Sequence, residues 1–123
     1  MMAKQKISYE PQVLDLILYA GDGSAFNLIV TDSLKVPVNL TGEMIAHIRK
    51  DRDTTDQSAE FEVDLTDAVD GIALLRLTGD VTQGLITEDV NFIGVWDVQW
   101  TPSGDEPMTL CQGKVECIPD VSR

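Results

Sequence analysis

The sequence has little positive charge. Its 123 residues include 9 lysines and arginines against 21 aspartates and glutamates, which gives a formal net charge of −12 at pH 7. Phosphate binding needs clustered basic residues, whereas here they are few and lie among carboxylates. The composition therefore excludes nucleic acid as a partner and opposes binding to an anionic membrane surface.

Long hydrophobic runs are also missing. No stretch approaches the ~18–20 apolar residues of a membrane span, and the opening Met-Met-Ala-Lys-Gln-Lys lacks the apolar stretch of a secretion signal. We therefore expect a chain that is made and kept in water. Because 43% of its residues are hydrophobic, it can bury one core and fold unaided as a single domain.

Histidine and cysteine are scarce. Cys111 and Cys117 lie on one predicted strand, about 20 Å apart at ~3.3 Å per residue, so they cannot bridge each other. We predict two buried thiols, with an intermolecular disulfide as the alternative. The sequence has no Cys-x-x-Cys pair or Cys/His cluster for zinc, and no glycine-rich phosphate loop. His47, the single histidine, has no nucleophile motif around it, so we predict no catalytic residue, no cofactor and no enzyme.

The strongest candidate for a metal site is the acidic stretch with Asp51, Asp53 and Asp56. An EF-hand loop also needs a central glycine and a closing bidentate glutamate, and neither is in place. We interpret the stretch as an exposed loop and predict no metal ligand.

Alternation of apolar and polar residues dominates the chain and predicts half-buried strands. Seven strands are expected, at residues 13–19, 26–31, 44–49, 60–65, 72–77, 92–101 and 108–118. A turn at 21–24 is expected to join the first two into a hairpin, and 78–86 to hold the only helical turn.

These strands predict an all-β fold, an immunoglobulin-like two-sheet antiparallel β-sandwich of about seven strands, with a small barrel as the alternative. The expected organisation is an N-terminal arm at 1–12, the sandwich at 13–118 and a C-terminal tail at 119–123. Trp96 and Trp100 share the parity of Val98, which predicts a core role. Exposed tryptophans would instead line a sugar-binding surface.

The two termini are the predicted partner-binding segments. Residues 1–9 carry +2 from two lysines, so the remaining residues carry −14. In a head-to-tail assembly such an arm would lie on a neighbour's acidic face; the alternative is a frayed terminus. The residues nominated for partner contacts are Lys4, Gln5, Lys6, Val121, Ser122 and Arg123.

Several short segments of the chain form a pattern: residues 32–37 with VNLTG (38–42), Ile48-Arg49, DAVDGI (67–72), GVWDVQ (94–99), and GKV (113–115) with PDVSR (119–123). Together these segments resemble a family of small structural proteins of tailed bacteriophages. The family includes proteins similar to the N-terminal β-sandwich domain of phage baseplate upper proteins, which anchors receptor-binding apparatus to the virion. This chain departs from the family pattern at Ser122, where threonine is commoner.

The resemblance implies a non-enzymatic virion structural protein, made in the host bacterial cytoplasm, whose partners are other virion proteins and copies of itself. Because the chain ends with the sandwich and no stalk follows, we expect a minor tail, baseplate or connector component. A capsid decoration protein is the first alternative. A carbohydrate-binding surface module using Trp96 or Trp100 is the alternative from another class, and a metal-dependent hydrolase would need a bound ion.

Overall fold

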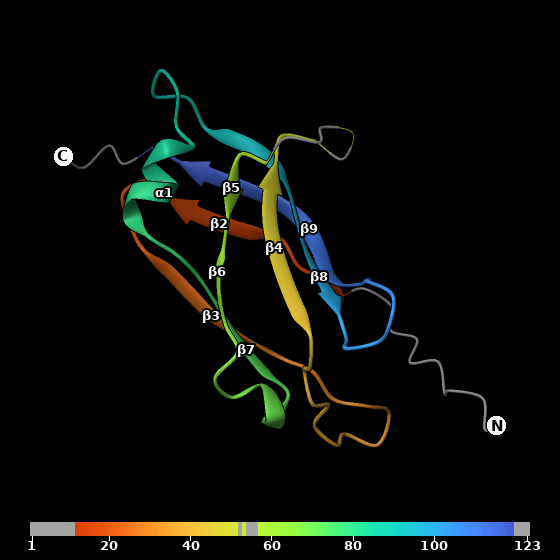
Figure 1. The fold of residues 1–123 in the computed structure, drawn as a ribbon. Coiled ribbons are helices and arrows are strands. Elements are labelled where there is room, and N and C mark those ends of the chain that lie inside the picture. Colours follow the sequence, from red (N-terminus) through yellow and green to blue (C-terminus); the bar gives the residue numbers. More distant parts are fainter. Residues whose placement is uncertain (1–11, 52, 54–56, 120–123) are drawn as a thin grey trace.

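A computed structural model describes residues 12–51, 53 and 57–119 of the chain. It holds two β-sheets that pack against each other and one short α-helix at one end (Figure 1). The fold is all-β and sandwich-like, as the alternating sequence predicts.

The larger sheet, sheet A, has the strand order β1-β9-β8-β4-β5, with β2 also paired to β9. Its strands are β1 (Gln12–Val13), β2 (Leu16–Tyr19), β4 (Glu43–Arg49), β5 (Ala59–Glu60), β8 (Phe92–Thr101) and β9 (Met108–Ile118). β4, β5, β8 and β9 pair antiparallel, whereas β1 and β2 run parallel to β9.

Sheet B has three antiparallel strands in the order β3-β7-β6. They are β3 (Ser24–Ile29), β6 (Glu62–Asp64) and β7 (Ile72–Leu77). A 3₁₀ turn, η1 (Ala68–Asp70), precedes β7, and the helix α1 (Gly79–Gly84) follows it.

The predicted hairpin of the first two strands is wrong. β2 pairs with β9 in sheet A, whereas β3 pairs with β7 in sheet B, so the turn at 21–24 crosses between the sheets. Thr82 of α1 is fully buried beneath this crossing. Its hydroxyl accepts a hydrogen bond from the Gly21 amide (3.1 Å) and lies 3.0 Å from the carbonyl oxygen of Asp22. The helix thus holds the turn in the conformation that leads the chain from sheet A to sheet B.

Two predicted strands are interrupted. The strand expected at 13–19 breaks at Leu14 and Asp15, and the Leu14 side chain is exposed. The strand expected at 60–65 divides at Phe61, where the chain passes from β5 to β6 and so from one sheet to the other. The Phe61 ring enters the core, with its centroid 5.7 Å from that of Trp96.

The core lies between the sheets and follows the predicted parity in the long strands. Met44, Ala46 and Ile48 of β4 are buried, as are Val115 and Cys117 of β9. The other buried apolar side chains are Leu18, Ala20, Val30, Leu40, Ala59, Phe61, Ala73, Leu75, Leu77, Leu85, Trp96, Val98, Trp100, Leu110 and Cys111. The alternating positions point outward and form the surfaces described next.

Candidate interaction surfaces

The termini nominated as partner-binding lie outside the described residues. They are Lys4, Gln5, Lys6, Val121, Ser122 and Arg123. Candidate surfaces are therefore built from the sandwich itself.

Both tryptophans are core residues, as their spacing predicts. Trp96 and Trp100 are each 2% exposed. Their indole nitrogens donate hydrogen bonds of 2.7 Å to the carbonyl oxygens of Leu14 and Thr41. A buried ring cannot stack on a sugar from solvent, so the carbohydrate-binding alternative loses the two side chains on which it rested.

A series of polar contacts crosses the outer face of sheet A. The register of β4 with β8 and β5 places His47 beside Asp97 and Glu60. Nε2 of His47 lies 3.1 Å from Glu60 Oε1, and Nδ1 lies 3.2 Å from a guanidinium nitrogen of Arg49. A second Arg49 nitrogen lies 3.5 Å from Asp97 Oδ1. Because a guanidinium only donates, Nδ1 accepts and Nε2 donates to Glu60, which fixes the ring.

A hollow of about 190 Å³ lies beside these contacts. It is smaller than the ~300–1,000 Å³ pockets that enclose small-molecule ligands. Its lining residues are Arg49, Val95, Trp96, Asp97, Gln112 and Gly113.

The acidic stretch considered as a metal site and interpreted as an exposed loop is a turn where the structure describes it. The Asp53 amide donates a hydrogen bond of 3.0 Å to Asp51 Oδ1. Asp56 lies outside the described residues. Within residues 12–51, 53 and 57–119, no group of three or more His, Cys, Asp or Glu side chains is placed to hold a metal ion.

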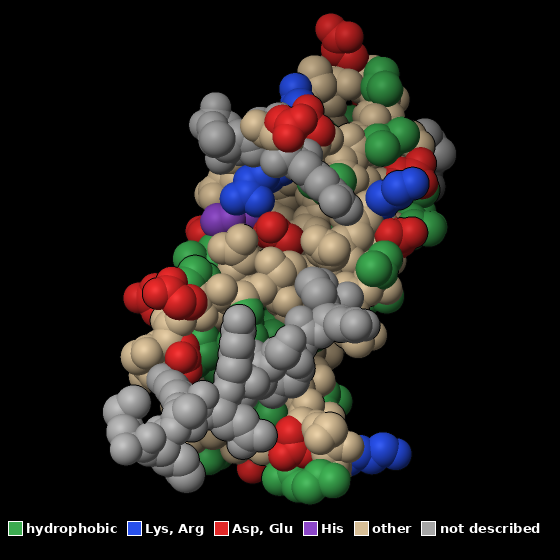
Figure 2. All heavy atoms as spheres, turned by 90° about the vertical axis from the view of Figure 1, so that its right-hand side faces the viewer, with side chains coloured by type: hydrophobic (Ala, Val, Ile, Leu, Met, Phe, Trp, Pro, Cys, Tyr) green, Lys and Arg blue, Asp and Glu red, His purple; other side chains and the backbone are tan. Residues whose placement is uncertain are grey.

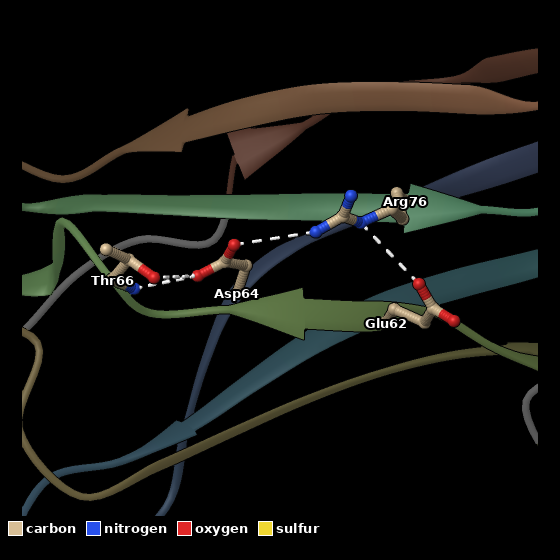
Figure 3. Close-up of polar contacts among 4 residues, drawn as sticks. All are labelled: Glu62, Asp64, Thr66 and Arg76. Atoms are coloured by element: carbon tan, nitrogen blue, oxygen red, sulfur yellow. Dashed lines mark hydrogen bonds and ion pairs between the residues drawn. The ribbon is translucent and has the colours of Figure 1, made fainter.

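Two acidic side chains on the outer face of sheet B share one arginine (Figure 3). Arg76 of β7 lies 3.5 Å from a Glu62 oxygen and 3.4 Å from an Asp64 oxygen, both on β6. The Thr66 hydroxyl and the Thr66 amide both donate hydrogen bonds to the Asp64 carboxylate. These two bonds lower the pKa of Asp64, and the bond from the hydroxyl has the larger effect. The Arg76 charge acts in the same direction with a smaller effect. These contacts hold the carboxylate in its ionised form.

The two cysteines are free and buried, as predicted. Burial raises the pKa of both the Cys111 and the Cys117 thiol. Such thiols stay protonated and are poor nucleophiles. Their burial also argues against the alternative of an intermolecular disulfide.

The first surface with interaction potential is a hairpin at residues 31–37, at the end of the sandwich away from α1 (Figure 1). Asp32 holds its shape, because one carboxylate oxygen accepts hydrogen bonds from the amides of Leu34 (2.8 Å) and Val36 (3.0 Å). Lys35 at the tip has φ 64°, a left-handed conformation that costs a non-glycine residue roughly 1–2 kcal/mol. This constrained loop presents Leu34 with 81% of its surface exposed.

The hairpin is anchored on the segment around η1. The Leu40 amide donates to the Ala68 carbonyl (2.9 Å), and the Val30 amide donates to the Gly71 carbonyl (2.8 Å). Gly71 has φ 75°, and a Cβ at this position would lie 2.5 Å from the Val30 carbonyl oxygen, so the approach requires glycine. Val69 of η1 is also exposed at this end.

The second surface, which we call the β9 patch, lies on the outer face of sheet A along β2, β9 and β8. The register places Ile17, Glu116 and Ile93 in one row. Lys114 and Val95 form the next row. Figure 2 shows this face of the molecule, where basic, acidic and hydrophobic side chains lie close together. The patch consists of Val13, Ile17, Tyr19, Ile93, Val95, Lys114 and Glu116.

Comparisons with protein-family models and with curated proteins find no match to this chain. Among the described residues, no helix is long and apolar enough to cross a lipid bilayer.

Proposed function

We propose that this protein is a non-enzymatic structural component of a tailed-phage virion, a minor tail, baseplate or connector protein that assembles through protein–protein contacts. Its partners are other virion proteins and copies of itself. The observation that carries the proposal is the hairpin end. Residues 32–42 and 67–72, two of the segments that resemble phage proteins, are hydrogen-bonded to each other there and support an exposed apolar tip.

The physical reason is that a rigid loop loses little conformational entropy when it binds. The Asp32 bonds and the left-handed Lys35 fix the loop before a partner arrives. The exposed Leu34 and Val36 then supply apolar area for a contact. A loop built in this way suits docking into a neighbouring protein.

The sandwich in this proposal is of the immunoglobulin-like type. In an immunoglobulin sandwich, strands B, E and D share one sheet and C, F and G the other, with variable-type domains adding C′ beside C. The order β3-β7-β6 corresponds to B-E-D, and β9-β8-β4-β5 corresponds to G-F-C-C′. The chain lacks the paired cysteines of antibody domains, so the correspondence concerns topology alone.

The location is tested by immunogold labelling of purified virus particles, with capsid, neck and tail tip scored separately. Label on the tail or neck supports the proposal, and label on the shell supports the capsid-decoration alternative. Particles with accessible epitopes and no label would contradict both. Mass spectrometry of the same particles gives the copy number.

The role of the hairpin is tested with a matched pair of variants. Leu34→Asp and Val90→Asp each put a carboxylate in place of an exposed aliphatic side chain. Leu34 belongs to the hairpin at 31–37 and Val90 to the turn at 87–90, and these two segments lie at opposite ends of the molecule (Figure 1). We expect Leu34→Asp protein to fold normally and to be depleted from particles, whereas Val90→Asp protein is incorporated as the wild type. Equal incorporation of both would contradict docking by the hairpin.

A further inference from the structure

The β9 patch combines exposed apolar side chains with both signs of charge at fixed spacing. Val13 is 75% exposed, Tyr19 53% and Ile93 69%. Lys114 and Glu116 point outward from β9. They alternate along the strand with Gly113, Val115 and Cys117, which lie on its inward face. The side-chain nitrogen Nδ2 of Asn91 donates a hydrogen bond of 2.7 Å to Glu116 Oε2 and orients that carboxylate.

Lys114 makes no ion pair within the part of the chain that the structure describes, although the Asp15 carboxylate accepts a hydrogen bond from its backbone amide. The protein as a whole is strongly acidic. The other described basic side chains that lie on sheet faces, Arg49 and Arg76, are each held by a carboxylate of the same chain. The patch therefore offers a free cation two residues from an oriented anion.

We infer that the β9 patch binds a second copy of this chain, in a two-fold symmetric pair with sheet A facing sheet A and the β9 strands antiparallel. A two-fold axis crossing β9 at Val115 exchanges the positions of residues 114 and 116. Lys114 of each protomer then faces Glu116 of the other, and the contact forms twice. A contact of this kind is isologous and closes on itself.

The apolar positions follow the same symmetry. Ile93 lies in the row of Glu116 and Val95 in the row of Lys114, so Ile93 of one copy meets Val95 of the other. Tyr19 lies beside Ile118, and Val13 beside Gln112, three positions to either side of Val115, so they also face each other. These positions therefore match apolar with apolar and cation with anion, whereas Ile17 faces the position of Asp15, which lies beside Lys114.

The charge of the remaining surface favours this face over the others. Two copies with a net charge of −12 repel each other wherever carboxylates meet carboxylates. On the β9 patch, the free Lys114 reverses that repulsion locally. At physiological ionic strength the Debye length is about 8 Å, so the repulsion between whole molecules is screened more than the direct contacts.

The test is sedimentation equilibrium of the purified full chain over a concentration series at physiological ionic strength. The wild type is expected to show a monomer–dimer equilibrium. Lys114→Glu alone and Glu116→Lys alone each place like charges opposite each other, and each should weaken the dimer about tenfold or more. The double variant Lys114→Glu with Glu116→Lys restores opposite charges and should restore the dimer.

Two controls keep the test specific. Lys35→Glu makes the same charge change at the hairpin, away from the patch, and should leave the dimer constant unchanged. Ile93→Asp should weaken the dimer, whereas Val69→Asp, an equally exposed aliphatic site at the hairpin end, should not. Circular dichroism establishes that each variant is folded.

Three results would overturn the inference: a wild type that is monomeric at every concentration, single charge variants that dimerise as tightly as the wild type, or a double variant that stays as weak as the single ones. The inference rests on the proposed function only in taking copies of the chain as partners. Failure of the dimer inference can be distinguished from failure of the proposed function, because immunogold labelling of particles does not depend on the dimer constant in solution.

Discussion

Replacing Gly113 by alanine tests how the N-terminal edge of sheet A is seated on β9. Gly113 lies opposite Trp96 and faces inward, where the chain between β1 and β2 passes close to it. A Cβ at residue 113 would overlap the Leu14 carbonyl oxygen and lie 2.6 Å from its carbon and 3.1 Å from Asp15 Oδ1. Alanine therefore fits only if Leu14 and Asp15 move away from β9.

The cost of that movement follows from the contacts it breaks. Trp96 Nε1 donates to the Leu14 carbonyl (2.7 Å), the Leu14 amide to Gln112 (2.9 Å), and the Lys114 amide to Asp15 (2.9 Å). Losing two of these bonds costs about 1–3 kcal/mol, and inserting a methyl group into a packed site costs about 1–3 kcal/mol more. The entropic gain from replacing glycine offsets about 0.5–1 kcal/mol. We expect a net destabilisation of about 1–5 kcal/mol.

Urea unfolding followed by tryptophan fluorescence measures this change, and Gly84→Ala is the matched control. Gly84 ends α1, and a Cβ there meets nothing within 4 Å. The control should be neutral or stabilise by up to about 1 kcal/mol. Hydrogen exchange should show faster exchange of the Leu16–Tyr19 amides in the Gly113 variant. Equal stabilities of the two variants would refute the reasoning.

Three further predictions follow from the polar contacts and the burial. Thr66→Val removes the hydroxyl bond to Asp64, so the lowered pKa of Asp64 should rise towards its ordinary value, as carbon-detected NMR titration would show. Because the depressed pKa contributes stability that is lost on acidification, the variant should be less stable than the wild type at neutral pH and equally stable once the carboxyl is protonated. Cys111 and Cys117 should react with a thiol reagent in urea but not in the native state, because burial raises the pKa of both thiols; fast native labelling would contradict this. Asp32→Ala should speed amide exchange in the hairpin with a loss of global stability of about 1–2 kcal/mol or less.

Much of the fold is predictable from the sequence where one face of a strand is buried and the other exposed. Met44, Ala46 and Ile48 alternate with outward residues, and the structure buries all three. The tryptophans on β8 share this parity and are equally buried. Alternation works here because the side-chain period of a strand is two, so the face of each residue follows from its position.

Which strands pair with each other is harder to predict, because the face on which a side chain lies does not depend on which strand is next to it in the sheet. Leu18 is buried whether β2 forms a hairpin with β3 or pairs with β9 in parallel. The turn at 21–24 has the composition of a hairpin, but it is held in a crossing path by Thr82, which is about 60 residues away and gives no local signal. The division at Phe61 has the same cause, since an inward aromatic residue suits either a continuous strand or a passage between sheets.

The segments DAVDGI (67–72), GVWDVQ (94–99) and GKV (113–115) predict the scaffold better than the contact surface. Gly71 and Gly113 lie where a side chain would meet the backbone of another strand or loop, and Trp96 caps the Leu14 carbonyl, so these positions support the sandwich itself. Of the two charges of the β9 patch, Lys114 lies in the GKV segment and Glu116 lies in none of these segments. Lys114 and Glu116 become neighbours of Ile17 and Ile93 only through the register of three strands, one of which, β2, is distant in sequence from the other two. A surface assembled by register therefore depends on the sheet order, which the parity of each strand leaves open.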